Sequence, residues 1–166
     1  MKKFEDYRGR EFMKAGILTF HHTNNYGASL QAYALKKAVE KLGIDCQVID
    51  YRCEKIEKSY KNYVSFKGKS LREIIKLLVY YRSTEKRRAR FEDFGQQLMN
   101  WSKKTYLSRE AILSDPPIYD KYLCGSDQVW NYHITNNDTT FFLDFVKENH
   151  KKVAYAGSFG LSEIDQ

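Results

Sequence analysis

The fold follows from residues 15–51, AGILTFHHTNNYGASLQAYALKKAVEKLGIDCQVIDY. The run at 15–20 is short and apolar, which is typical of a buried strand. A polar loop at 21–27 follows, and from 28 to 42 apolar residues recur every three or four positions, which predicts a helix. Residues 46–51 have the composition of a second strand. Strand, glycine-containing loop, helix and strand form a βαβ unit, whose two strands are parallel.

The rest of the chain repeats this alternation. Residues 118–124 and 152–156 are predicted strands, and residues 140–146 fit either a strand or an ordered loop. The expected fold class is therefore α/β, with a Rossmann-like parallel sheet flanked by helices.

The segment at about 68–115 is predicted to be helical. Ser70 and Glu73 have the spacing of a capping box, and a second helix is expected over about 84–101. An apolar stripe follows the capping box and consists of Leu71, Ile74, Ile75, Leu78 and Tyr81.

Three polar, glycine-containing loops follow three of the predicted strands. They are the first edge loop (21–27), the second edge loop (125–131, GSDQVWN) and the third edge loop (157–160, GSFG). The carboxyl ends of parallel strands meet at one edge of a sheet, which is where open α/β sheets bind ligands. We therefore expect the three loops to line one cleft.

The second edge loop has the composition of a carbohydrate site. Asp127 can accept hydrogen bonds from sugar hydroxyls or act as a base, and Trp130 offers a flat apolar face to a sugar ring. Gln128 and Asn131 add amide donors and acceptors. The alternative is an Asx-type turn beside a core tryptophan.

The first edge loop leads into a helix N-terminus, a position that favours anions. Gly27 allows a close approach, and Asn24 or Asn25 can cap the helix, so a plain capping turn is the alternative. His21 is the second catalytic candidate after Asp127. The adjacent His21 and His22 point to opposite sides of an extended segment, so no metal site is expected.

Composition restricts the partners. The net charge is +7, yet residues 52–110 alone hold 16 Lys and Arg against 7 Asp and Glu, a net charge of +9. This segment is either a solvated helical face or a surface for an anionic partner, with peripheral contact to the inner face of a membrane as one such use. Nucleic acid is not an expected partner, because no nucleic-acid-binding motif accompanies the charge.

Neither a membrane span nor a secretory signal is present in the sequence. The three cysteines, Cys46, Cys53 and Cys124, fit no zinc spacing and are expected to be reduced structural thiols. These features predict a cytoplasmic protein with no metal and no cofactor.

The successive motifs GILTFHHTNNYGASLQAYAL, VIDYR, LCGSDQVWN, FFLDFV and KKVAYAGSFG resemble those of the polysaccharide pyruvyl transferase family, in collinear order over about residues 14–164. The resemblance implies the N-terminal half of a GT-B-like two-domain enzyme. The domain plan is then an N-terminal extension at 1–13, a Rossmann-like domain at 14–166, and a C-terminal donor-binding domain that is absent from this sequence. A lone half with an exposed cleft edge also predicts a homodimer.

The resemblance also implies an activity and a set of site residues. Enzymes of this family transfer a pyruvyl group from phosphoenolpyruvate to two hydroxyls of one sugar as a ketal, in cell-surface polysaccharide biosynthesis. The acceptor would be a lipid-linked or cell-wall glycan. The matching substrate-binding positions are Asn25, Tyr26, Gly27, Ser29, Gln31, Gly125, Ser126, Gln128, Trp130, Ser158 and Gly160.

Two other functions remain open from the sequence. One is a glycosyltransferase-like enzyme that uses a nucleotide sugar. The other is a non-catalytic module that binds a glycan or a protein partner. Both keep the same fold, so the chemistry of the cleft has to separate them.

Overall fold

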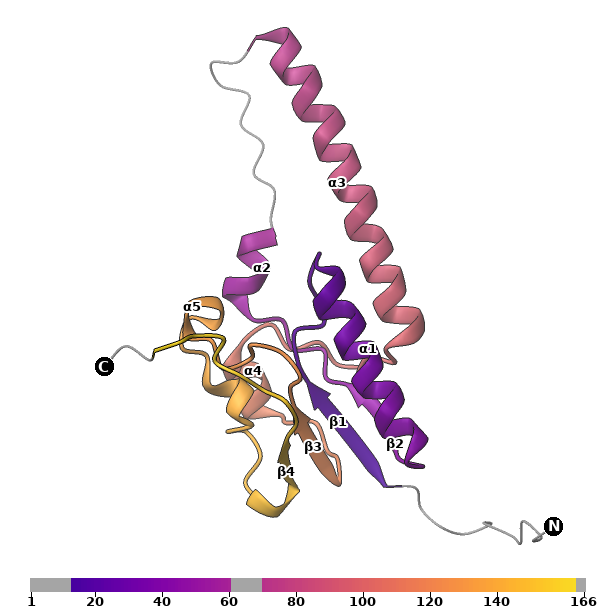
Figure 1. Cartoon of the computed structure of the whole chain (residues 1–166), viewed down its shortest axis with the longest axis vertical. Coiled ribbons are helices and arrows are strands. Elements are labelled where there is room, and N and C mark those ends of the chain that lie inside the picture. The colour runs from indigo at the N-terminus through magenta and orange to yellow at the C-terminus, as the bar shows by residue number, and fades with distance from the viewer. Residues whose placement is uncertain (1–12, 61–69, 164–166) are drawn as a thin grey trace, which may run out of the picture.

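The computed structural model describes residues 13–60 and 70–163 (Figure 1). Of the expected extension at 1–13, only Met13 lies among them. The described part is an α/β protein in which helices flank a four-stranded sheet.

The sheet is parallel throughout and has the order β2-β1-β3-β4. The strands are β1 (Lys14–Leu18), β2 (Asp45–Val48), β3 (Lys121–Cys124) and β4 (Lys152–Ala154). All four predicted strands are confirmed, and each is shorter than predicted. β1 and β2 end before the polar loops that follow them. Because the sheet is parallel and flanked by helices, the expected α/β fold class is confirmed.

Helix α1 (Tyr26–Lys41) covers one face of the sheet. Its Ala32, Leu35 and Val39 pack with Ala15 and Ile17 of the central strand. Ile17 is fully buried, as expected for a parallel sheet covered on both faces.

The opposite face is covered by the segment at 140–146, which is an ordered loop and not a strand. The 3₁₀ helix η1 (Thr139–Phe142) begins at Asp138, whose side chain accepts a hydrogen bond from the Thr140 amide, and Leu143 ends it in the left-handed conformation. Phe141 and Leu143 are buried against this face. The apolar run at 140–146 therefore forms a cover over the sheet.

Helix α3 (Leu71–Leu98) is one continuous helix, and the prediction of a separate second helix over about 84–101 is wrong. No glycine or proline lies between Ser70 and Gly95 to interrupt it. The Ser70–Glu73 capping box is confirmed. Figure 1 shows α3 extending far beyond the sheet, so the apolar stripe at its start does not pack on the sheet: Leu71 is 75% exposed.

The remaining elements are short. They are α2 (Glu54–Tyr60), α4 (Arg109–Ser114), α5 (Tyr132–Thr135) and the 3₁₀ helix η2 (Asn149–Lys151). Cys46, Cys53 and Cys124 are all buried free thiols.

A buried carboxylate joins the chain segments behind the first edge loop. Asp50 is only 3% exposed and follows directly on β2. Its oxygens contact His21 Nε2 at 3.0 Å, Arg52 Nε at 2.9 Å and Thr105 Oγ1 at 2.6 Å. Burial alone raises the pKa of Asp50, but the hydrogen bonds from His21, Arg52 and Thr105 outweigh it and hold the pKa well below its usual value.

We expect Asp50→Asn to lower the free energy of unfolding by about 3 kcal/mol, because it removes the buried negative charge that His21, Arg52 and Thr105 contact. Since the folded-state pKa of Asp50 is depressed, its stabilisation is complete above the unfolded value of about 4 and is lost as the pH falls through the folded value. Urea unfolding at neutral and acidic pH measures both effects. Equal stability of variant and wild type at neutral pH would contradict this role.

Candidate functional site

The three edge loops lie at one edge of the sheet, as predicted, but only the first and second edge loops line the groove there, and the expectation that all three line one cleft is wrong for residues 157–160. The Ser158 amide donates to the Asp127 carbonyl at 3.0 Å, and the Trp130 amide donates to the Ser158 carbonyl at 3.2 Å. The Gly125 amide donates to the Leu18 carbonyl at 3.2 Å, at the end of β1. The second edge loop is thus held by the third edge loop on one side and by the central strand on the other.

Gln31 ties helix α1 to this edge. Its Nε2 donates to Thr19 Oγ1 at 2.9 Å, and its Oε1 accepts from Ser126 Oγ at 3.0 Å. Both Gln31 and Ser126 were predicted to bind substrate. In the structure they link the end of β1 to the second edge loop, and their substrate contact stays a prediction.

Two glycines allow the loops to approach one another. Gly125 has φ +114°, and a Cβ there would lie 2.1 Å from the Tyr155 carbonyl oxygen. Gly160 has φ +64°, and a Cβ there would lie 2.2 Å from the Gln128 side chain. A larger residue at Gly125 would displace the backbone at Tyr155, and one at Gly160 would displace the Gln128 side chain and strain the left-handed backbone. The glycines of the family motifs therefore pack the second and third edge loops together.

The open space at this edge is a groove of about 410 Å³, a volume in the range of small-ligand sites. Of the predicted residues, Asn25, Asp127 and Gln128 line it. The other lining residues come from the first edge loop, α1, α2 and α5: Phe20, Thr23, Ala28, Lys55, Ile56, Ser59, Tyr60, His133 and Ile134.

The polar groove residues that sequence reasoning missed are Thr23, Lys55, Ser59, Tyr60 and His133. Helix α2 follows the carboxyl end of β2, and α5 follows the second edge loop. The rule that ligands bind at this edge could have identified α2, but neither segment has a motif of its own.

Asp127 lies on the groove wall contributed by the second edge loop. Its Oδ1 accepts a hydrogen bond from the Gln128 amide at 2.7 Å, which fixes the direction of the carboxylate. The charge of Asp127 acts on Tyr60. Burial raises the pKa of the Tyr60 hydroxyl, and the negative charge of Asp127 raises that pKa further. An acid and a phenol therefore share the groove.

The start of α1 is a capped helix end. Asn25 Oδ1 accepts from the Gly27 amide at 2.8 Å and from the Ala28 amide at 3.3 Å. Two of the free amides on which the anion-site interpretation depended are thus already paired. Of the predicted residues in the first turns of α1, Ser29 is buried and Tyr26 is exposed. The ring centroids of Tyr26 and Phe91 of α3 lie 4.8 Å apart.

His21 lies behind the groove. The residue is 3% exposed, and its ring nitrogens face the Thr19 carbonyl at 3.2 Å and the Asp50 carboxylate at 3.0 Å. Both nitrogens have partners inside the protein. The structure thus places His21 in the Asp50 network, and a catalytic role for it stays a prediction.

Trp130 is half-buried between aromatic rings. It stacks on Phe142 with the ring centroids 5.8 Å apart, contacts Phe159 at 5.7 Å, and donates from Nε1 to the Phe141 carbonyl at 3.1 Å. Gly157 lies against the same indole. In these contacts the indole joins the second edge loop, the third edge loop and η1, and sugar stacking stays a prediction.

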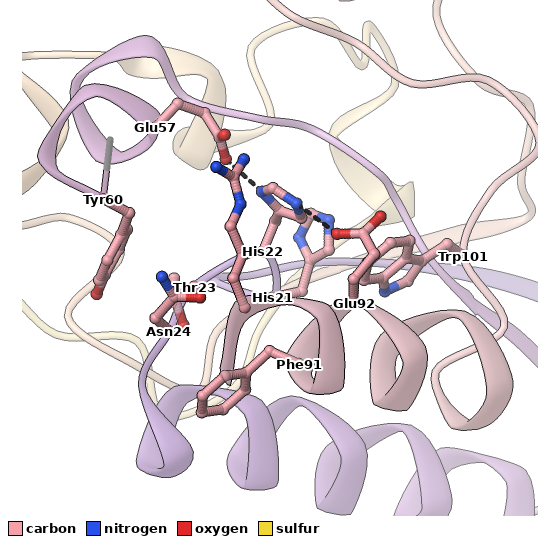
Figure 2. A pocket seen from close by; sticks show the side chains of 10 residues that line it. His21, His22, Thr23, Asn24, Glu57, Tyr60, Phe91, Glu92 and Trp101 are labelled. Atoms are coloured by element: carbon pink, nitrogen blue, oxygen red, sulfur yellow. Dashed lines mark hydrogen bonds and ion pairs between the residues drawn. The ribbon is translucent and has the colours of Figure 1, made fainter. Parts of the chain in front are cut away.

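An ion-pair cluster adjoins the groove on the side of α3 (Figure 2). His22 Nδ1 contacts Glu57 of α2, and its Nε2 contacts Glu92 of α3 at 2.8 Å. Burial lowers the pKa of His22, but the hydrogen bond and charge of Glu57, together with the hydrogen bond to Glu92, raise it by more. The imidazole therefore bridges α2 at the wall of the groove and α3, and its two acidic partners favour its protonated form.

These features define a class of protein: an open parallel α/β sheet with a groove of mixed polar and apolar lining at the carboxyl ends of its strands. The sequence model of the family described as polysaccharide pyruvyl transferase matches residues 25–166, and the chain belongs to this family. No curated protein and no solved structure matches the chain significantly. Among residues 13–60 and 70–163, no cluster of His, Cys, Asp and Glu has the arrangement of a metal site.

We expect His22→Gln to destabilise the protein by about 2 kcal/mol at mildly acidic pH, because two charge-assisted hydrogen bonds are lost. The folded-state pKa is raised, so the stabilisation by His22 is complete below its unfolded value of about 6.5 and is lost as the pH rises through the folded value. Thermal melts of variant and wild type across pH measure this difference. A gap that widens with rising pH would refute the assignment.

Trp130→Ala is expected to lower the free energy of unfolding by about 3 kcal/mol, because a large packed side chain and one hydrogen bond disappear. Trp130→Phe keeps the aromatic contacts and should lose less. Chemical denaturation of both variants tests the packing role. Wild-type stability for Trp130→Ala would show instead that the indole is free to serve a ligand.

Proposed function

We propose that this chain takes part in the transfer of a pyruvyl group from phosphoenolpyruvate to a sugar, which forms a ketal. The observation that carries the proposal is the groove bordered by the Asp127 carboxylate in a member of this family. The acceptor is a sugar of a cell-surface polysaccharide, carried on a lipid or in the cell wall. The reaction takes place in the cytoplasm.

The chemistry sets clear demands on the groove. Two sugar hydroxyls add to C2 of the donor, C3 gains one proton and becomes a methyl group, and the phosphate leaves with the second proton. The hydroxyls lose their protons as the new bonds form, and positive charge develops at C2 before the ring closes. A base near the acceptor and groups that stabilise the changing charges are therefore needed.

Asp127 is the proposed acceptor-side base. Its carboxylate is held in direction by the Gln128 amide and lines the same groove as Asn25, whose polar side chain borders the space for a sugar. A sugar hydroxyl bound beside this carboxylate is oriented for attack, and the carboxylate accepts the proton of that hydroxyl.

Lys55 and His133 supply the groups on the α2 and α5 sides of the groove. Lys55 is the cation that can pair with the carboxylate or phosphate of the donor, and the His133 imidazole can form a hydrogen bond with a substrate in the groove. With Asp127, the groove contains a candidate base and a cation, which are two of the groups that the reaction needs.

The test is turnover of phosphoenolpyruvate with a panel of acceptor glycans, followed by phosphate release and by mass spectrometry of the sugar. We expect Asp127→Asn to lower kcat by roughly 100-fold, the usual size of a lost proton transfer. Asp115→Asn is the matched control, because that exposed carboxylate lies outside the groove and pairs with Lys104.

Two outcomes would contradict the proposal. Full turnover by Asp127→Asn would remove Asp127 as the base. Glycan binding without phosphate release by the wild-type protein would favour a non-catalytic glycan-binding module, and release of a nucleotide from a nucleotide sugar would favour a glycosyltransferase.

A further inference from the structure

The long helix α3 is fixed to the body of the protein at one end. Its contacts to the body come from Phe91 against Tyr26, Phe94 against Tyr33, and Glu92 against His22. The helix starts at Leu71, so at 1.5 Å per residue about 30 Å of it precedes Phe91. Figure 1 shows this part of the helix rising clear of α1 and the sheet.

The distal turns expose an apolar face. We call residues 71–82 the α3 tip. Leu71, Ile75 and Leu78 are spaced four and three residues apart, so they share one side of the helix, and they are 75%, 54% and 46% exposed. Val79 and Tyr80 are exposed as well, at 65% and 64%. A soluble protein rarely leaves so many large apolar side chains together in water without a use.

Basic residues flank this apolar face on one side. Arg72 and Lys76 lie beside it, and Arg82 and Lys86 continue its line along the helix toward the body. Over residues 71–90 the helix has seven Arg and Lys against two Glu, a net charge of +5. An apolar face bordered by cations is the pattern of helices that lie in the interface of an anionic membrane.

We propose that the α3 tip docks on the surface of a membrane that contains anionic lipids, with its apolar side chains at the level of the acyl chains and its basic residues among the headgroups. This inference rests on the surface of α3 and not on the proposed reaction. The membrane contact expected of the basic segment 52–110 is thereby assigned to one helix, α3.

The charge distribution favours this occupant over a second copy of the chain. Two α3 tips packed face to face would bring two sets of basic residues together, whereas an anionic surface neutralises them. Among residues 13–60 and 70–163, no helix is long and apolar enough to cross a membrane. The proposed contact is therefore peripheral, and with a short apolar face it is reversible and depends on charge.

The experiment is flotation of the full chain with vesicles of phosphatidylcholine, with and without about 30% phosphatidylglycerol. We expect binding to the anionic vesicles alone, and a loss of most of that binding when NaCl is raised from about 0.05 M to about 0.5 M. Each basic residue near the surface contributes about fivefold, so Arg72→Gln with Lys76→Gln should lower the partition coefficient about 25-fold.

A second variant tests the apolar face. Ile75→Gln with Val79→Gln should lower partitioning roughly tenfold or more, with unchanged thermal midpoints because both residues are exposed. The matched controls lie outside α3: Lys103→Gln with Lys147→Gln for charge, and Ile118→Gln for an apolar residue that is 90% exposed. Both controls should bind like the wild type.

Three results would overturn the proposal. Equal binding to neutral and anionic vesicles, or none to either, would exclude a charge-dependent contact. Wild-type binding by the Ile75/Val79 variant would reduce the contact to nonspecific charge attraction. A dimer in sedimentation experiments that the Ile75/Val79 variant dissociates, without vesicle binding, would assign the face to a second copy of the chain.

Discussion

The arrangement of the site depends on one buried carboxylate. Asp50 sits at the carboxyl end of β2 and receives hydrogen bonds from His21, Arg52 and Thr105, which come from three different parts of the chain. A charge in this position is tolerated only because its partners surround it, and each partner is thereby fixed in place. His21 anchors the start of the first edge loop, so the position of that loop relative to β2 is set from behind the groove.

The family motifs hold the edge together more than they face the groove. Gln31 and Ser126 join α1, β1 and the second edge loop, and Gly125 and Gly160 allow backbone to approach backbone or side chain. Only Asp127, Gln128 and Asn25 of the predicted residues line the open space. The motif residues of this chain therefore have a packing role at the loop edge as well as any chemical role in the groove.

The sequence predicted the elements whose signals are local. The βαβ unit, the parallel strands, the Ser70 cap and the meeting of the three edge loops all follow from apolar periodicity, capping chemistry and the topology of parallel sheets. The burial of His21 was not predictable, because its partner Asp50 lies 29 positions away and only the sheet brings them together. The groove residues on α2 and α5 were missed for the same reason. The second helix expected over about 84–101 is instead the continuation of α3, because no glycine or proline interrupts the chain between Ser70 and Gly95.

The single imidazole of His22 touches both α2, which forms a wall of the groove, and α3, which extends about 30 Å from its anchor. A long rigid helix fixed near one end is a lever, and the Glu92 contact lies on its short arm beside the fulcrum. A shift of α3 at Glu92 would therefore reach Glu57 of α2 through this one imidazole. The groove is thus mechanically connected to whatever the distant end of that helix rests upon.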